Sequence, residues 1–166
     1  MPIRFGTYNT RNSRNGGLES ALRGIFQANT ELGIFQEAEV TDGIYTHLSA
    51  GYSVVVTNAT SQHRGRVPVF HQPVPHFAVE AVQQFGPNVV GFHLATGDRR
   101  WYIVGCYLAP NNTLTIESVA AALMERSMGA ELLVAGDFNA NLAEPEGDPR
   151  GEDIASELAT EVLEDT

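Results

Sequence analysis

Three apolar segments of the chain each end in side chains that could bind a metal ion or a phosphate group. The residues at these ends are Asn9, Glu37, Asp137 and Asn139. Carboxylates provide hard anionic oxygens, which suit Mg²⁺ or Mn²⁺, and amides can donate hydrogen bonds to phosphate oxygens without adding negative charge. Such a set could polarise a phosphorus centre and steady an attacking water. Zinc fits less well, because no Cys or His pair shows the spacing of zinc ligands.

The order of the expected elements brings these ends together. Residues 3–9 and 32–37 are predicted strands, and the apolar residues between them recur at helical spacing, namely Leu18, Leu22, Ile25 and Phe26. A strand, a helix and a strand form a parallel pair by a right-handed crossover, so Asn9 and Glu37 should finish at one sheet edge. If the strand before Asp137 joins that sheet in parallel, its carboxylate arrives where open α/β sheets bind ligands. Taken alone, Gly-Asp-Phe-Asn is equally a polar turn after a buried core strand.

The middle of the chain is predicted to be mainly β structure in an antiparallel or mixed sheet. The expected strands are residues 52–57, 67–71, 77–82, 89–95 and 101–108, with a hairpin turn at Gly97-Asp98. Pro68 argues against a central position for its strand. A core-facing helical stripe, closed by Gly129, comprises Ile116, Val119, Ala120, Leu123 and Met124. A last helix is expected from Asp148-Pro149, with Ile154, Leu158 and Val162 on one face.

Composition indicates one globular domain of 166 residues with an unequal distribution of charge. The net charge is −10, and 43% of the residues are hydrophobic. Residues 1–100 carry +1 and residues 101–166 carry −11, and every basic residue is Arg. The acidity argues against tight non-specific binding of nucleic acid. The arginines expected in loops near the sheet edge, which either contact phosphates or only solubilise the chain, are Arg11, Arg14, Arg64 and Arg66.

No apolar run is long enough to span a bilayer, and no signal peptide is recognised at the N-terminus. Cys106 is the only cysteine, which excludes an internal disulfide and fits a reducing, intracellular compartment. It lies within an apolar predicted strand, so burial is expected.

The motifs resemble those of the endonuclease/exonuclease/phosphatase (DNase I-like) superfamily. They are Tyr-Asn at 8–9, Phe-Gln-Glu at 35–37 and Gly-Asp-Phe-Asn at 136–139. Within the superfamily the chain is most similar to the endonuclease domain of fungal non-LTR retrotransposons, a likeness supported by Tyr-Ile-Val-Gly-Cys-Tyr-Leu-Ala-Pro at 102–110. The resemblance extends from Arg4 to about Asp153, and it implies an α/β fold, a four-layer α/β sandwich with mixed β-sheets.

The resemblance also implies roles for matching residues. Glu37 would be the principal ligand of Mg²⁺ or Mn²⁺, with Asn9 beside it. Asp137 would orient or activate the water, and Asn139 would stabilise the transition state. Tyr107 would contact the phosphate, although two residues rather than one separate it from Pro110; a tyrosine that only packs in its strand is the alternative. Asn111 is a further phosphate-binding candidate.

The largest departure from the family pattern is the missing Ser-Asp-His motif, since no histidine follows Asn139. The resemblance therefore predicts a single domain, residues 1–166, that is an incomplete sandwich lacking its C-terminal Asp-His segment. A positioned acid–base group contributes about 10²–10⁴ in rate, so weak activity is expected. His71 or His76 could substitute, but ordinary strand-edge or loop positions are the simpler interpretation. An unpaired sheet edge would favour self-association.

The leading hypothesis is a metal-dependent phosphodiesterase-type domain, derived from a retrotransposon endonuclease that hydrolyses one DNA strand. The resemblance implies DNA as the partner and the nucleus as the location, and no membrane partner is expected. One alternative is a phosphatase or phosphodiesterase on a small or lipid phosphate substrate. The other is a non-catalytic remnant or binding module.

Overall fold

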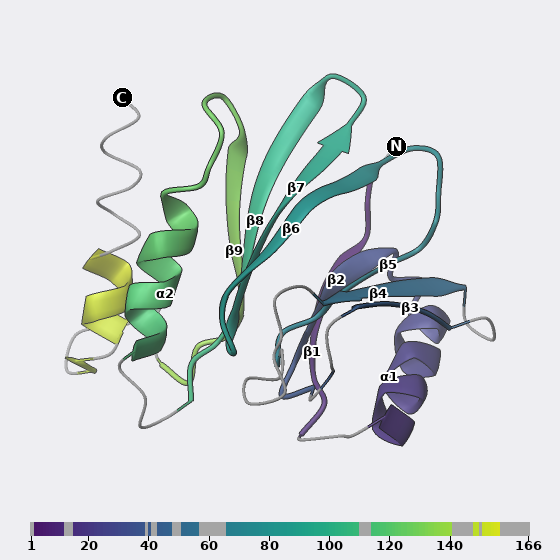
Figure 1. Cartoon of the computed structure of the whole chain (residues 1–166), viewed down its shortest axis with the longest axis horizontal. Helices are drawn as coiled ribbons and strands as arrows, with labels where there is room; N and C mark the ends of the chain where they lie inside the picture. Colours follow the sequence, from purple (N-terminus) through teal and green to yellow (C-terminus); the bar gives the residue numbers. More distant parts are fainter. Residues whose placement is uncertain are drawn as a thin grey trace.

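Two β-sheets and two main helices make up the fold (Figure 1). The computed structural model describes residues 2–11, 15–38, 40, 43–47, 51–56, 66–109, 114–140, 148–149 and 151–156. The elements are β1 (Phe5–Asn9), α1 (Asn15–Gln27), β2 (Leu32–Gln36), β3 (Gly43–His47), β4 (Tyr52–Val56), β5 (Val69–His71), β6 (Ala78–Gly86), β7 (Val89–Thr96), β8 (Arg99–Tyr107), α2 (Leu114–Leu123) and β9 (Glu131–Asp137).

The sheets form the two inner layers of a four-layer sandwich. The first sheet has the strand order β1-β2-β5-β4-β3 and the second has the order β6-β7-β8-β9. α1 packs on the outer face of the first sheet, and α2 packs on the outer face of the second. Apolar side chains of both sheets meet between them in a third core cluster. Each sheet contains one parallel pair, β1 with β2 and β8 with β9, so the predicted α/β sandwich with mixed sheets is confirmed.

The first strand–helix–strand unit forms as its sequence pattern predicts. Leu18, Leu22 and Ile25 of α1 are buried against β2, β4 and β5, because their spacing keeps them on one helix face. β1 and β2 pair in parallel from Phe5 with Leu32 to Asn9 with Gln36. Phe26 was expected in the same stripe, but it is 53% exposed and makes an edge contact with the Tyr52 ring.

The position of β9 corrects one expectation. β9 does not join β1 and β2; it pairs in parallel with β8 at the edge of the second sheet. Because one flank of an edge strand lacks a neighbour, its apolar side chains are half-buried rather than buried on both faces. Gly136 lies inside β9, where it pairs with Cys106.

The position of β5 corrects another. β5 lies in the centre of the first sheet, between β2 and β4, although Pro68 argued for an edge. The strand begins at Val69, directly after the proline, whose carbonyl still accepts a hydrogen bond from Phe35 N–H at 3.0 Å. A proline at the entry to a strand removes no donor from the strand itself.

Most other predicted elements are present, although they begin or end at residues that differ from the predicted bounds. The Gly97-Asp98 turn joins β7 to β8, α2 contains the predicted stripe up to Leu123, and residues 151–156 are helical. β3 was not predicted, and Met124, placed in the core stripe, is 79% exposed just beyond the end of α2. Leu158 and Val162 fall outside the described residues. None of the helices that the structure describes is both long and apolar enough to cross a membrane.

Candidate metal and phosphate site

Asn9, Glu37 and Asp137 meet where strands of the two sheets end. The Nδ2 amide of Asn9 donates to Oε1 of Glu37 at 2.9 Å and to Oδ2 of Asp137 at 2.9 Å. Asn9 ends β1 and Glu37 directly follows β2, whereas Asp137 ends β9 of the other sheet. The predicted convergence therefore occurs, but it occurs across the sandwich rather than along one sheet.

The backbone at this junction is unusually constrained. Five non-glycine residues of the described chain have positive φ, and three of them are at the site, Arg11 at 51°, Glu37 at 56° and Asn139 at 46°. Such conformations cost of order 1–3 kcal/mol each and tend to cluster at functional sites. Local hydrogen bonds hold two of them: Arg11 N–H donates to Asn9 Oδ1 at 2.7 Å, and Asn139 N–H donates to Asp137 Oδ1 at 3.2 Å.

Thr10 is a part of this junction that sequence reasoning missed. Its N–H and its Oγ1 hydroxyl both donate to the Gln36 carbonyl, at 2.8 Å and 3.0 Å. These bonds extend the pairing of β1 and β2 by one residue and fix the chain on either side of Asn9 and Glu37. The position of a threonine directly after Asn9 was the only signal in the sequence.

Gly136 allows β9 to reach the site. Its φ is 153°, and a Cβ added there would lie 1.9 Å from the Cys106 carbonyl oxygen. Any side chain would therefore push β9 away from β8, and Asp137 would move with it.

Tyr107, at the end of β8, belongs to the same site. It is 8% exposed, and its hydroxyl hydrogen-bonds to the Glu37 carboxylate. Burial raises the pKa of Tyr107, and the hydrogen bond and negative charge of Glu37 raise it further, while Arg66 opposes the shift. The tyrosine therefore stays protonated and can donate to Glu37.

Asn139 faces the end of β8. Its Nδ2 amide donates to the Leu108 carbonyl at 3.0 Å, and Leu108 N–H donates to the Asp137 carbonyl at 2.8 Å. These bonds fasten the segment after β9 to the segment after β8. The predicted role of Asn139 in stabilising a transition state stays a prediction.

The predicted phosphate-binding residues divide into two groups. Arg11 and Arg66 lie at the site, Arg11 through its bond to Asn9 and Arg66 with its guanidinium 5.2 Å from the centroid of the Tyr107 ring. The residues outside the described part of the chain are Arg14, Arg64 and Asn111.

His71 and His76 lie at the other end of the first sheet. His71 pairs with Leu32, the first residue of β2 and roughly 16 Å along the strand from Glu37. His76 Nε2 is 3.2 Å from Glu31 Oε1. Neither histidine can take part in chemistry at Glu37 and Asp137.

The donor set of the site fits a hard divalent cation. Both carboxylate oxygens lie 2.9 Å from one amide nitrogen, so they are no more than 5.8 Å apart. No cluster of three or more His, Cys, Asp or Glu suited to a metal occurs among the described residues. Two carboxylates without histidine or thiolate suit Mg²⁺ or Mn²⁺, which retain water ligands.

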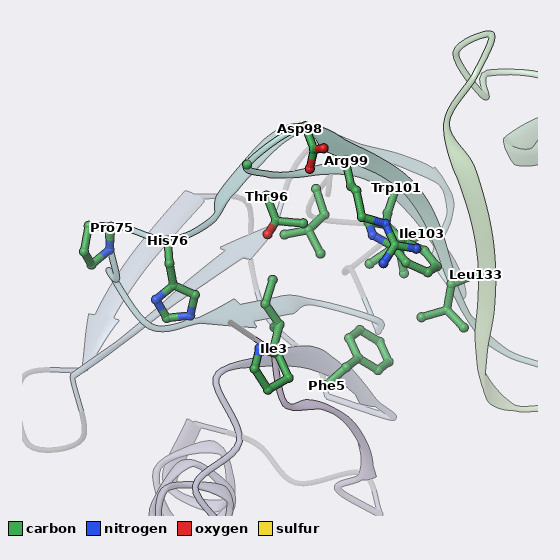
Figure 2. Close-up of a pocket in the computed structure, with 13 residues that line it drawn as sticks. Ile3, Phe5, Pro75, His76, Thr96, Asp98, Arg99, Trp101, Ile103 and Leu133 are labelled. Carbon is green, nitrogen blue, oxygen red and sulfur yellow. The ribbon is translucent and has the colours of Figure 1, made fainter.

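A hollow of about 800 Å³ lies at the opposite end of the sandwich, and of the histidines considered above it is lined by His76. Figure 2 shows Pro75 and His76 on one side and Arg99, Trp101, Ile103 and Leu133 on the other, with Ile3 and Phe5 between them. Its lining is mainly apolar. Sequence reasoning did not find it, because it depends on how the two sheets diverge.

Comparison with known proteins identifies similar solved structures but no matching sequence family. No protein-family model and no curated protein matches the sequence. Among solved structures, the endonuclease domain of TRAS1, a telomere-specific non-LTR retrotransposon, is 18% identical with a TM-score of 0.68, over 96% of this chain and 71% of that one. ANGEL2, a 2′,3′-cyclic phosphatase, is 16% identical with a TM-score of 0.60, over 92% of this chain and 61% of that one.

A mannosyl-6-phosphatase of Bacteroides thetaiotaomicron is 11% identical with a TM-score of 0.61, over 93% of this chain and 70% of that one. The similar structures also include one described as an endonuclease/exonuclease/phosphatase family protein. The chain therefore has the DNase I-like fold, which nucleases and phosphatases share.

Proposed function

We propose that this chain is a metal-dependent phosphodiesterase-type hydrolase, which cleaves a phosphate ester by attack of water. The observation that carries the proposal is the Asn9 amide held between the Glu37 and Asp137 carboxylates, which come from different sheets. The constrained backbone around them supports it, because strain that the fold maintains at one cluster of polar residues suggests function. The fold shared with an endonuclease domain and two phosphatases is consistent with it.

Glu37 would hold Mg²⁺ or Mn²⁺, with Asn9 beside it, and the bound ion would supply positive charge to a phosphate oxygen. Asp137 would orient the attacking water and accept its proton, since its carboxylate lies on the same amide as Glu37. Tyr107 would keep Glu37 in place and lie against the phosphate, and Asn139 would stabilise charge that develops in the transition state.

We further propose that the substrate is a DNA strand and that the domain derives from a retrotransposon endonuclease. Arg11 and Arg66 would contact its phosphates at the site, with help from Arg14, Arg64 and Asn111. Because the chain carries a net charge of −10, DNA affinity should depend on these few arginines and should fall with added salt. The resemblance to retrotransposon endonucleases would place the protein in the nucleus, which imaging of a tagged chain would test.

The test is nicking of supercoiled plasmid in Mg²⁺ by wild type, Glu37→Gln and Asp137→Asn. Both variants keep side-chain shape and remove one charge, so we expect each to lose at least about 10²-fold in rate while thermal unfolding changes little. Glu80→Gln, an exposed carboxylate of β6, is the matched control and should nick like the wild type. Nicking that survives in both site variants would contradict the proposal.

A second candidate substrate is a small or lipid phosphate ester, which the acidic character of the chain favours over duplex DNA. The same variants should be assayed on bis(4-nitrophenyl) phosphate and on 4-nitrophenyl phosphate. Turnover of these esters without nicking would favour this candidate. No turnover of any substrate by folded protein would favour a non-catalytic remnant or binding module.

A further inference from the structure

Arg66 is fixed at the junction of the two sheets, beside the candidate site. Its carbonyl accepts a hydrogen bond from Ala38 N–H at 3.2 Å, and Ala38 directly follows Glu37. Its own N–H donates to the Pro87 carbonyl at 2.8 Å, in the turn between β6 and β7. The residue thus links the end of β2 in one sheet to the start of β7 in the other.

The side chain of Arg66 continues this link to Tyr107. Its guanidinium carbon lies 5.2 Å from the centroid of the Tyr107 ring, within the range of a cation–π contact. The ring is buried on the inner face of the second sheet, and its hydroxyl reaches the Glu37 carboxylate in the first. The Arg66 guanidinium therefore contacts the ring of Tyr107, whose hydroxyl interacts with Glu37.

The planar shape of the guanidinium matters for this contact. A guanidinium can stack on an aromatic ring and is weakly hydrated, whereas a lysine ammonium is a compact and strongly hydrated charge. The guanidinium lies over one face of the Tyr107 ring, and the two backbone bonds of Arg66 fix the position from which it makes this contact. The orientation of Glu37 then depends on a residue that need not touch a metal ion or substrate.

We propose that Arg66 is a positioning residue, which seats the Tyr107 ring so that its hydroxyl holds Glu37 in the orientation that binds the metal ion. The role depends on the hydrolase function proposed above, and it gives Arg66 a task besides phosphate contact. A second arginine over an aromatic ring provides an internal comparison, because the Arg99 guanidinium lies 4.9 Å from the Trp101 ring centroid at the opposite end of the sandwich.

The experiment is a double-mutant cycle with Arg66→Lys, Tyr107→Phe and the double variant. The lysine keeps the charge but loses the planar guanidinium over the ring, and the phenylalanine keeps the ring but loses the hydroxyl. Mn²⁺ affinity is read from electron paramagnetic resonance of the free ion, and kcat from ester hydrolysis. We expect each single variant to lower both by about three- to ten-fold, and the double variant to resemble Tyr107→Phe alone.

Arg99→Lys is the matched control and should leave Mn²⁺ affinity and kcat unchanged. If the losses in Mn²⁺ affinity and kcat of the two single variants multiply in the double variant, Arg66 acts independently of Tyr107 and the proposal is overturned. A wild-type-like Arg66→Lys variant would overturn it as well.

A third readout separates this inference from the hydrolase function. The aromatic NMR signals of Tyr107 in the metal-free protein should change in Arg66→Lys and stay unchanged in Arg99→Lys. If the wild type binds no Mn²⁺ and hydrolyses nothing, the hydrolase proposal fails, and these signals still report whether Arg66 seats the ring. Unchanged Tyr107 signals in Arg66→Lys would overturn the positioning role whatever the activity.

Discussion

The two ends of the sandwich differ although the same strands build both. At one end, β1, β2 and β9 finish in polar side chains that hydrogen-bond between the sheets, on a backbone with several positive φ angles. At the other end, the sheets enclose a mainly apolar hollow of about 800 Å³, bordered by the β7–β8 turn. The volume of a hollow is therefore a poor guide to chemistry in this fold. The constrained and mutually bonded groups are at the carboxyl ends of the parallel strands.

The largest effect should come from crowding the close strand contact at the polar end. Gly136→Ala should lower the free energy of unfolding by about 3 kcal/mol or more, or prevent folding, because the new Cβ meets the Cys106 carbonyl. Gly97→Ala, in the turn beside the hollow, also has positive φ but open space around it. The free energy of unfolding of the Gly97→Ala variant should therefore fall by only about 1–2 kcal/mol. Urea unfolding measures both, and equal losses would show that φ alone sets the cost.

The next effect should appear in activity rather than in stability. Asn9→Ala removes the amide that aligns both carboxylates, so kcat/KM should fall by about 10²-fold. The free energy of unfolding should change by no more than about 1.5 kcal/mol. His76→Ala, at the hollow, should change kcat/KM by less than about two-fold. A comparable loss in His76→Ala would mean that the hollow takes part in the reaction.

A smaller effect is expected at the sheet edges. We propose that the chain self-associates through β9, an edge strand with regular pairing and no charged residue between Glu131 and Asp137. Leu133→Lys, on β9 at the hollow, should weaken association by about ten-fold in sedimentation equilibrium. The edge strand β6 has register shifts that discourage pairing, so Gln83→Lys should have no effect. A wild type that stays monomeric at all concentrations would refute the proposal.

The smallest effect should follow from the ion pair beside the hollow. Arg99 contacts both carboxylate oxygens of Glu131, at 2.6 and 2.7 Å, but both side chains are about half exposed. Solvent screening reduces such pairs to about 0.5 kcal/mol. Arg99→Ala should lower the free energy of unfolding by that amount in low salt and by less in 1 M NaCl, measured in urea. A loss above about 2 kcal/mol would show that Arg99 supports the core.

The parts of the molecule that sequence could predict are those set by local pattern. The spacing of Leu18, Leu22 and Ile25 predicted α1, and its position between two strands predicted the parallel pair that brings Asn9 beside Glu37. The arrival of Asp137 was also predicted, but in the wrong sheet. An apolar run does not specify its partner strand, because pairing depends on segments distant in sequence.

The remaining features depend on contacts between distant segments. The contact of Arg66 with the Tyr107 ring and the central position of β5 both bring together residues that are distant in sequence, and no local spacing predicts them. The positive φ angles of Glu37 and Asn139 likewise cannot be predicted from the residue types at these positions. The roles of Arg14, Arg64 and Asn111 stay predictions.

The hydrogen bond between Asn9 and Asp137 has a consequence for synthesis. The two residues are 128 positions apart, so they cannot meet while a ribosome is still making the chain before β9. At about 5–20 residues per second, Asn9 and Glu37 wait several seconds or more without the second carboxylate. A nascent chain that already contains the first sheet should therefore be inert toward any phosphate ester near it, and activity should begin only once β9 has docked.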